Sequence, residues 1–426
     1  MNALVVGSDG RAHALTWRLA RSASIERYWC APGNPGIAAL TDCHPVDPND
    51  PSAVAQLAAD LRADLVVVSA EEPLVNGVVD AVEARGILGF GPKAAAARLE
   101  GSKAWMKEVL ADAGVPTARH ATFGAGEEER ALAFLAELPG LYVVKTDGLA
   151  AGKGVVVTEQ IAEARDAVRR YLSGEAFGDA GRTLVIEEGL TGPELSLLVV
   201  CNGTTDGAPL APAQDFKRIG DGDAGPNTGG MGAYSPVPAA GPGLVDDVME
   251  RAVRPTLHEL ARRGIEYRGV LYAGIMLTPD GAKVLEYNVR FGDPEAQVVL
   301  PRLAGDFAQL CHDAAAGQVV EASFSDEACV TVVLATEGYP AAPRPGDVIA
   351  GIDAAEQVPG VTVFHAGTAE RDGALVTAGG RVLDVSAVAA SLTEARERAY
   401  EAAARITWRG MQYRRDIAGG AATAAA

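Results

Sequence analysis

The first 91 residues alternate short apolar runs with amphipathic segments, and this pattern constrains the fold more than any other feature of the chain. Residues 3–6, 65–68 and 87–90 read as strands, and the segments between them carry apolar side chains at helical spacing. Strands that alternate with helices form a parallel, doubly wound sheet, which binds ligands at the carboxyl ends of its strands. The first turn does not complete the glycine pattern of dinucleotide-binding folds, so the sequence argues against an NAD site.

A glycine-rich segment at residues 145–154 lies between two runs of β-branched residues, which favours a hairpin with a flexible tip. Gly148, Gly152 and Gly154 let the backbone come close to a ligand and point N–H groups at it. Lys145 and Lys153 add positive charge at either end, and this combination suits a polyphosphate. The segment is not a Walker A loop, because a strand follows it rather than a helix. An ordinary surface hairpin with solvated lysines is the alternative.

A second candidate site lies on the strand at residues 285–290, where side chains alternate between two faces. Glu286, Asn288 and Arg290 share one of these faces. Glutamate and asparagine oxygens are hard ligands that suit Mg²⁺, which completes its coordination with phosphate and water. Arg290 can bind a phosphate or a carboxylate with two hydrogen bonds. The alternative is a solvated strand face, but the polar, turn-rich residues 291–295 that follow disfavour it.

A segment at residues 186–190 joins the smaller unit around the hairpin to a larger one. Its backbone N–H and C=O groups can bind the edge of an adenine, and Glu194 could accept hydrogen bonds from ribose hydroxyls. Lys103 falls in the first turn of a helix, where a cation is poorly placed relative to the helix dipole and can serve an external anion. Together these features indicate an enzyme that binds a magnesium–nucleotide complex beneath a flexible flap.

Composition excludes several classes of partner. A net charge of −19 at pH 7 argues against a nucleic-acid-binding protein and against an anionic membrane surface as partner. The five cysteines contain no C-x-x-C pair, which excludes the usual zinc and redox motifs and favours a reducing compartment. No apolar run approaches the length of a transmembrane helix. We therefore expect a cytoplasmic protein.

The chain length favours roughly three domains. We expect an N-terminal doubly wound domain at residues 1–101, a central domain at 102–325 and a small mixed α/β domain at 326–418. The smaller unit with the hairpin, which we name the flap, is expected at about 117–191. The glycine-rich stretch at 214–236 is expected to form a long loop, and the tail at 419–426 to be disordered.

Several long strings of residues resemble the ATP-grasp superfamily and, within it, the glycinamide ribonucleotide synthetase family. The resemblance extends to about residue 417 and rests on the strings at residues 31–36, 99–103, 147–154, 214–215, 225–236 and 286–295. It implies an α/β fold of the ATP-grasp type, with a two-part central domain and a mobile flap. It also implies a monomer or a weak homodimer.

The resemblance implies roles for the residues of the nucleotide site. ATP would be the cosubstrate and Mg²⁺ or Mn²⁺ the metal. The phosphates would be bound by Lys103, Lys145 and a loop that contains Gly148, Gly152, Lys153 and Gly154. Adenine would lie against Glu187, Glu188 and Leu190, the ribose against Glu194, and the metal against Glu286 and Asn288.

The resemblance also implies the reaction. The glycine carboxylate would attack the γ-phosphate to give an acyl phosphate, which the amine of 5-phosphoribosylamine would then attack. Arg290, Asp293 and Lys145 would be catalytic. The substrate-binding residues would be Gly10, Arg11, Gly33, Asn34, Asp215, Lys217, Arg290 and Asp293.

The sequence departs from the family pattern near the amine substrate. Ala12 stands where the family usually has glutamate, Asp9 replaces a small residue, and Ser69-Ala70 replaces a Gly-Pro pair. A paralogous ATP-grasp ligase that uses a different amine in secondary metabolism is therefore the alternative function. A nucleotide-binding module without catalysis is a third hypothesis.

Overall fold

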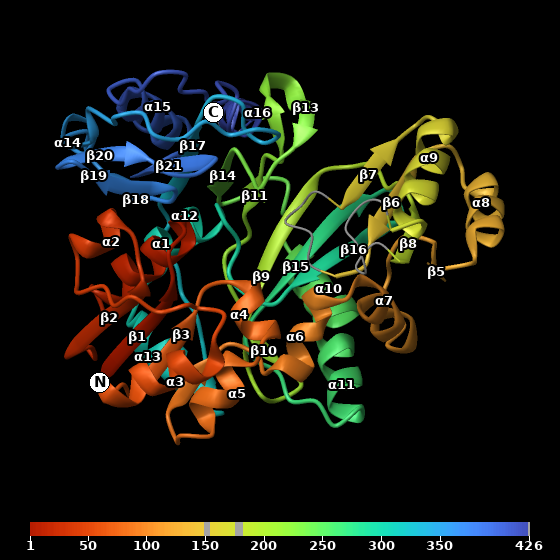
Figure 1. Ribbon diagram of the computed structural model, residues 1–426, viewed down its shortest axis with the longest axis horizontal. Helices are drawn as coiled ribbons and strands as arrows, with labels where there is room; N and C mark the ends of the chain where they lie inside the picture. The colour runs from red at the N-terminus through yellow and green to blue at the C-terminus, as the bar shows by residue number, and fades with distance from the viewer. Residues whose placement is uncertain (149–153, 175–181, 425–426) are drawn as a thin grey trace.

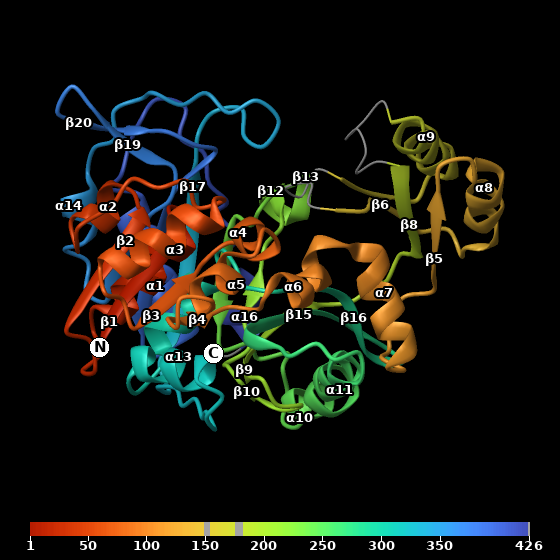
Figure 2. The ribbon, with the colours of Figure 1, turned by 60° about the horizontal axis from the view of Figure 1, so that its bottom comes forward.

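The computed structural model describes residues 1–148, 154–174 and 182–424 of the chain. Figures 1 and 2 show an N-terminal unit beside a C-terminal unit, and a flap at the opposite end of the molecule. A larger sheet lies between them. Within the described residues, no helix is both long and apolar enough to cross a membrane.

The N-terminal unit is a parallel sheet with the strand order β2-β1-β3-β4, as the alternation of strands and helices predicted. The two central strands, at residues 2–7 and 65–68, are buried on both faces, which explains their continuous apolar character. The strands are β1 (Asn2–Gly7), β2 (Arg27–Pro32), β3 (Leu65–Val68) and β4 (Leu88–Phe90). The helices are α1 (Gly10–Leu19), α2 (Pro35–Ala38), α3 (Pro51–Asp60), α4 (Glu71–Val75), α5 (Val78–Glu83) and α6 (Ala94–Gly101). The next helix, α7 (Lys103–Asp112), lies beside the larger sheet (Figure 1).

The flap is an antiparallel sheet with the strand order β5-β8-β6-β7. Its elements are β5 (His120–Gly124), α8 (Glu128–Glu137), β6 (Tyr142–Thr146), β7 (Val155–Thr158), α9 (Ile161–Leu172) and β8 (Thr183–Glu188). The predicted hairpin is confirmed, because Lys145 pairs with Val155 across it. The flap packs around an apolar core of its own, separate from the core shared by the other units. A unit with a separate core can move as one body.

The larger sheet is antiparallel, with the strand order β10-β9-β15-β16. Its strands are β9 (Glu194–Asn202), β10 (Gly207–Pro209), β15 (Arg268–Thr278) and β16 (Gly281–Asn288). The helices around it are α10 (Leu244–Val248), α11 (Arg254–Arg262), α12 (Ala296–Val299) and α13 (Phe307–Ala315). Residues Met249–Val253 form a π-helix between α10 and α11, just before Pro255 in the first turn of α11.

The C-terminal sheet corrects one sequence prediction. The stretch at 214–236, expected to be a loop, forms β11 (Gln214–Asp215), a ribbon of β12 (Arg218–Gly220) and β13 (Ala224–Asn227), and β14 (Gly232–Ser235). β11 and β14 extend the C-terminal sheet, whose order is β11-β14-β17-β21-β18. Its other strands are β17 (Ala328–Ala335), β18 (Val361–His365) and β21 (Arg381–Ala389), beside a ribbon of β19 (Thr368–Arg371) and β20 (Ala374–Thr377). The domain boundaries expected from the sequence stay a prediction.

The tail corrects a second prediction. Residues Gly419–Ala424 form helix α16, whereas the sequence suggested disorder. Helix α16 packs on α15 (Leu392–Ala403), where Thr393 Oγ1 donates a hydrogen bond to the Ala422 carbonyl at 3.1 Å. The short helix α14 (Ile352–Ala355) completes this unit. Packing on α15 stabilises a segment whose composition alone carries little structural signal.

Candidate active site

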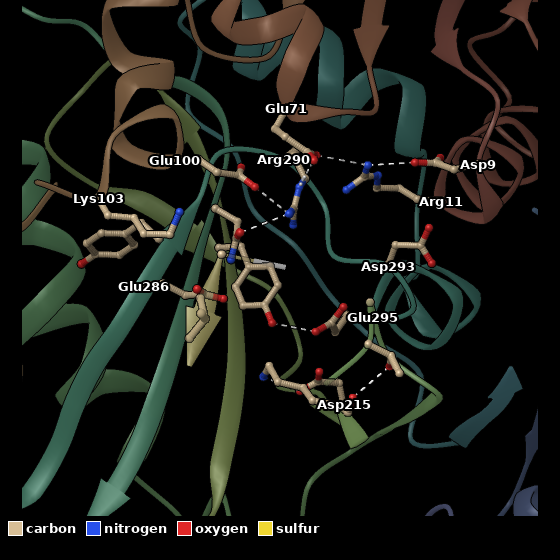
Figure 3. Close-up of a pocket in the computed structure, with 18 of the residues that line it drawn as sticks. Asp9, Arg11, Glu71, Glu100, Lys103, Asp215, Glu286, Arg290, Asp293 and Glu295 are labelled. Atoms are coloured by element: carbon tan, nitrogen blue, oxygen red, sulfur yellow. Dashed lines mark hydrogen bonds and ion pairs between the residues drawn. The ribbon is translucent and has the colours of Figure 1, made fainter. Parts of the chain in front are cut away.

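A cavity of about 480 Å³ lies where the N-terminal unit, the flap, the larger sheet and the C-terminal unit meet (Figure 3). Seven carboxylates and five cationic side chains line it among the described residues. The carboxylates are Asp9, Glu71, Glu100, Asp215, Glu286, Asp293 and Glu295. The cations are Arg11, Lys103, Lys217, Arg290 and Arg381. Because carboxylates outnumber cations in this lining, divalent metal cations would favour the binding of a polyphosphate there.

Arg290 lies at the centre of a charged network in this cavity. Its Nε donates to Glu71 Oε2 at 3.1 Å, and its Nη2 donates to Glu100 Oε1 at 2.6 Å and to Asn288 Oδ1 at 3.1 Å. Nη1 donates to the Phe291 carbonyl at 3.3 Å. An arginine has five N–H donors, so these bonds leave one donor on Nη1 for a ligand.

Figure 3 shows Glu71 between Arg290 and Arg11, which joins the N-terminal unit to the larger sheet. Arg11 Nη2 donates to Asp9 Oδ2 at 2.8 Å and lies 3.6 Å from Glu71 Oε2. Burial alone would raise the pKa of Glu71, but Arg290 and Arg11 outweigh it and lower that pKa to about 2. Glu71 is therefore ionised at neutral pH and holds both arginines.

The predicted metal ligands lie on β16 and line the cavity together. A bulge at Leu285 interrupts the alternation of β16, since Gly274 pairs with Glu286 while Ile275 pairs with Val284. Beyond the bulge Glu286 and Asn288 share one face, and Tyr287 is buried on the other, as the pattern predicted. Burial raises the pKa of Glu286, but Lys145, Lys217 and Lys103 lower it below its usual value. The carboxylate is therefore ionised.

No cluster of three or more metal-binding side chains exists in the part of the chain that the structure describes. A metal site of protein ligands alone is therefore not formed there. Mg²⁺ commonly takes one or two carboxylates and leaves its other positions to substrate phosphates and water. One carboxylate and one amide oxygen on a shared strand face fit that pattern, because both are hard oxygen donors.

The two lysines predicted for the phosphates occupy different environments. Lys103 Nζ donates to the Gly148 carbonyl at 2.9 Å and so connects helix α7 to the start of the glycine-rich segment. Lys145 is buried, with Nζ 2.8 Å from Glu187 Oε1. Burial lowers the pKa of Lys145, but Glu187 and Glu286 outweigh it and raise the pKa above its usual value. Lys145 therefore keeps its charge.

Glu187 is held by two lysines at once. Lys107 Nζ lies 2.8 Å from Glu187 Oε2 and donates to Thr117 Oγ1 at 2.7 Å. Thr117 Oγ1 in turn donates to the Val284 carbonyl at 2.6 Å. These contacts connect the flap strand β8 to α7 and β16. The side chain of Glu187 therefore holds the flap on the larger sheet, while its predicted contact with adenine stays a prediction.

The other residues predicted for the nucleotide lie at the join between the flap and the larger sheet. Glu188 Oε1 accepts from the Arg119 N–H at 3.0 Å, and Glu194 accepts from Lys217. Leu190 lies two residues beyond the end of β8 and is partly buried. Gly154 lines the cavity. Gly152 and Lys153 lie outside the described residues.

A second polar cluster lies at the far side of the cavity from Lys103 (Figure 3). Asp215 Oδ1 accepts from Lys217 at 3.0 Å, as expected of two residues predicted to bind substrate together. Tyr272 donates to Glu295 Oε1 at 2.6 Å. Burial raises the pKa of Asp215 to about 7 against the opposing effect of Lys217, and Glu295 and Glu194 raise it further. This acidic cluster suits a cationic group of a substrate.

Three residues assigned to the substrate by resemblance do not line the cavity within the described structure. A Cβ atom on Gly10 would lie 2.0 Å from Asp384 Oδ2, and one on Gly33 would lie 2.3 Å from Cys43 Sγ. Asn34 Nδ2 donates to the carbonyls of Ser8, at 2.9 Å, and His365, at 2.8 Å. Its Oδ1 caps α2 by accepting from the Ile37 N–H at 3.0 Å. In this structure these three residues hold neighbouring segments of the protein together, through close packing at Gly10 and Gly33 and through hydrogen bonds at Asn34.

We therefore expect Asn34→Ala to lower stability rather than substrate affinity. The substitution removes a helix cap and leaves two carbonyls without a donor, which costs about 3 kcal/mol. Thermal unfolding should show a lower midpoint, while the KM for the amine substrate stays the same. Asn76→Ala is the control, because Asn76 is exposed at the end of α4. An unchanged midpoint with a raised KM for the amine would instead support the role implied by the resemblance.

Of the four residues that depart from the family pattern, only Asp9 is among the described residues that line the cavity. Asp9 caps α1 by accepting from the Ala12 N–H at 2.7 Å, while Ala12 itself is fully buried. Ser69 is also fully buried, and Ala70 precedes α4 as its N-cap. The departures at Ala12, Ser69 and Ala70 therefore change packing around the first strands.

Sequence reasoning did not find several residues of the site. Glu71, Glu100, Tyr272, Glu295, Tyr339 and Arg381 line the cavity but were not predicted as site residues. Glu100 and Glu295 lie within strings 99–103 and 286–295 on which the resemblance rests, so those strings carried an unused signal, whereas Glu71 lies outside all of them. Tyr339 and Arg381 belong to the C-terminal unit, and nothing in their local sequence points to a ligand.

Asp384 is a buried acid beside the site, and its charge should make stability depend on pH. It is fully buried and accepts from Gln297 Nε2 at 2.8 Å. Burial raises its pKa to about 7, and Asp293 adds to this effect against Arg381. The folded chain therefore keeps a proton that the unfolded chain releases between about pH 4 and pH 7, so stability from this group falls as pH rises through that window.

We expect Asp384→Asn to remove this loss, because the amide stays neutral at every pH. Relative to the unchanged protein, the melting temperature of the variant should rise as the pH increases from about 4 to about 7 and should level off above that. Thermal unfolding over this range measures the difference. A difference that stays constant with pH would contradict a raised pKa for Asp384.

Comparison with known proteins gives a consistent result along the whole chain. Family models of phosphoribosylglycinamide synthetase match in order: the N domain over residues 1–100, the ATP-grasp (A) domain over 101–296 and the C domain over 329–420.

Individual proteins match over nearly the full length. The chain is 51% identical to a phosphoribosylamine–glycine ligase of Streptomyces coelicolor, with 100% of both chains covered. It is 47% identical to one of Brucella melitensis, with 98% of this chain and 97% of the relative covered. Among solved structures, a phosphoribosylamine–glycine ligase of Thermotoga maritima matches with a TM-score of 0.83 at 33% identity, over 98% of this chain and 100% of that one. The α/β fold of the ATP-grasp type, predicted from the sequence, is thereby confirmed.

Proposed function

Since this chain belongs to the phosphoribosylglycinamide synthetase family, we propose that it joins glycine to 5-phosphoribosylamine in an ATP-dependent step of purine biosynthesis. The products are glycinamide ribonucleotide, ADP and phosphate. The observation that carries this proposal is the similarity to the Streptomyces coelicolor enzyme along the entire chain. The chain is a carbon–nitrogen ligase.

ATP enters at the end of the cavity formed by the flap and β16. Lys103 and Lys145 bind its phosphates beside Gly148 and Gly154, while the residues between these two glycines lie outside the described structure. Each such lysine–phosphate contact is worth roughly 4 kcal/mol before desolvation, at about 4 Å and an effective dielectric near 20. The adenine lies at the join near Glu188 and Leu190, and Glu194 faces the ribose. The separate core of the flap supports this proposal, because the flap can close as one body.

Glu286 and Asn288 would hold a divalent cation, Mg²⁺ or Mn²⁺. The excess of carboxylates in the cavity and the hard oxygen donors on β16 both fit such an ion. When bound, it supplies positive charge that neutralises the transferring phosphoryl group.

The chemistry is then a phosphoryl transfer followed by an acyl transfer. The glycine carboxylate attacks the γ-phosphate of ATP and gives glycyl phosphate and ADP. The amine of 5-phosphoribosylamine attacks the glycyl carbonyl carbon and displaces phosphate. Arg290 faces the acyl phosphate with its remaining N–H donor, and Asp293 lies on the amine side. Most of the rate enhancement comes from holding the three substrates in the orientation required for reaction and from neutralising charge.

The acidic cluster indicates how glycine is oriented. The carboxylates of Asp215 and Glu295 face the cavity opposite Lys103, so they attract the glycine ammonium group. The glycine carboxylate then points towards the nucleotide end. Arg11, which lies in the N-terminal unit, faces the phosphoribosyl group.

A screen of amines with glycine and ATP held fixed tests the proposal. ADP release should require both glycine and 5-phosphoribosylamine. Release with another amine and none with 5-phosphoribosylamine would favour the paralogous ligase of secondary metabolism, and Asp9 in the cavity would then be the first residue to replace. A chain that binds ATP and never releases ADP would be a binding module. The cytoplasmic location and the monomeric or weakly dimeric state stay predictions.

A further inference from the structure

Two residues of the C-terminal unit, Tyr339 and Arg381, line the cavity. Arg381 is the first residue of β21 and is largely buried, with 19% of its side chain exposed. Tyr339 accepts from the Gly229 N–H at 3.0 Å. The C-terminal unit therefore contacts the site, although β21 lies far along the chain from every predicted site residue.

The guanidinium of Arg381 contacts two other segments around the cavity. Its Nη1 donates to the Gly229 carbonyl at 2.7 Å, to the Gly230 carbonyl at 3.4 Å and to the Asp293 carbonyl at 2.7 Å. Its Nη2 lies 3.3 Å from Asp293 Oδ2. These partners belong to the segment before β14 and to the turn after β16. A rigid fork of N–H donors suits such simultaneous contacts.

Asp293 is thereby held from two directions. Gln297 Nε2 donates to Asp293 Oδ1 at 2.9 Å and to Asp384 Oδ2 at 2.8 Å. Asp384, like Arg381, belongs to β21 and packs against Gly10 at the start of α1. One strand therefore fixes Asp293 both directly, through Arg381, and indirectly, through Gln297.

The position of β21 is itself fixed by contacts with the N-terminal unit. β18 pairs with β21, and the His365 N–H at the end of β18 donates to His13 Nδ1 at 2.7 Å. Asn34 donates to the His365 carbonyl from the other side. Burial and the neighbouring His365 lower the pKa of His13 to about 3, so His13 stays neutral and remains an acceptor. This docking holds β21, and Arg381 with it, at the cavity.

We propose that Arg381 is a positioning residue that holds the Asp293 carboxylate in the orientation required for ligation. It acts through Asp293, since the hydrogen bonds of Nη1 and the ion pair of Nη2 are directed at protein groups, among them Asp293. This inference rests on the ligase activity proposed above. It assigns to the C-terminal unit a part in the acyl-transfer end of the site.

Steady-state kinetics of Arg381→Ala test the proposal. We expect kcat to fall about 100-fold, as for other losses of alignment that leave the reacting groups in place. The KM for ATP should stay the same, because Lys103 and Lys145 contact Gly148 and Glu187 rather than Arg381. Arg381→Lys should be nearly as slow, since an ammonium group cannot replace the planar set of N–H donors of the guanidinium. Guanidinium ion, added at concentrations that leave the unchanged protein unaffected, should restore part of the activity of Arg381→Ala.

A double-mutant cycle with Asp293→Asn tests whether the effect passes through Asp293. If it does, the double variant is no slower than Asp293→Asn alone, because the losses are not additive. Arg414→Ala is the control: Arg414 is a buried arginine of the same unit that contacts Asp223 and Asp416, away from the cavity. It should lower the melting temperature and leave kcat unchanged.

Several results would overturn the proposal. These are an unchanged kcat in Arg381→Ala, additive losses in the cycle, or a slow Arg381→Ala that guanidinium does not restore. If Arg381→Ala does not fold, Arg381→Gln takes its place in the same measurements. An unchanged protein without ligase activity would refute the proposed function instead, so the two failures are distinguishable.

Discussion

Replacement of Lys145 by methionine is expected to lower turnover about 1,000-fold, which corresponds to roughly 4 kcal/mol of lost charge interaction with a phosphate. Methionine has a similar length and fills the same buried space without a charge. Glu187 keeps Lys107 at 2.8 Å, so the carboxylate is not left unpaired. Initial rates at saturating glycine and amine, with ATP varied, measure the effect, and thermal unfolding checks that the fold is intact.

Lys107→Met is the matched control for this prediction. Both variants leave one lysine on Glu187, so their effects on stability should be similar. Their effects on activity should differ, because Lys107 is directed at Glu187 and Thr117. We expect Lys107→Met to keep activity within about tenfold of the unchanged protein, as for a substitution outside the reacting groups. Equal losses in both variants would contradict a phosphate-binding role specific to Lys145.

Replacement of Glu286 by glutamine is expected to raise the Mg²⁺ concentration required for half-maximal activity about 1,000-fold. Glutamine keeps the shape and one oxygen donor but removes the negative charge, which is worth roughly 4 kcal/mol to a nearby cation at an effective dielectric near 20. The low pKa of Glu286 means that this charge is present at neutral pH. A titration of ligase activity with Mg²⁺ at fixed ATP measures the shift.

Glu295→Gln is the control for the metal titration. Glu295 is another buried carboxylate that lines the cavity, but its Oε1 accepts from Tyr272 and Ser196. Its replacement should change glycine kinetics and leave the Mg²⁺ requirement unchanged. If both variants shift the titration equally, the metal does not lie on β16, and the assignment to Glu286 and Asn288 is wrong.

Short-range patterns in the sequence predicted much of this structure. The alternation predicted for residues 285–290 placed Glu286, Asn288 and Arg290 on one face, and the cavity has all three in its lining. The parallel N-terminal sheet and the flap hairpin followed from periodicity in the same way. These features depend on neighbours within a few residues, and such local preferences are visible in one sequence.

Contacts between distant segments could not be predicted. Arg290 is held by Glu71 and Glu100, which are 219 and 190 residues away in the chain. The segment at 214–236 has the glycine and proline content of a loop, yet β14 forms because β17 offers it a partner. Helix α16 depends in the same way on α15. In each of these cases tertiary pairing overrides local propensity.

The interleaved strand β14 has a consequence for attempts to divide this protein. β17 is an eight-residue strand, buried throughout, between β14 and β21. Cutting the chain near residue 326 would strip β14 away and expose a long, flat, apolar edge that invites aggregation. Swapping the last hundred residues between relatives should therefore yield soluble chimaeras only when the stretch that contains β11 and β14 is exchanged with them.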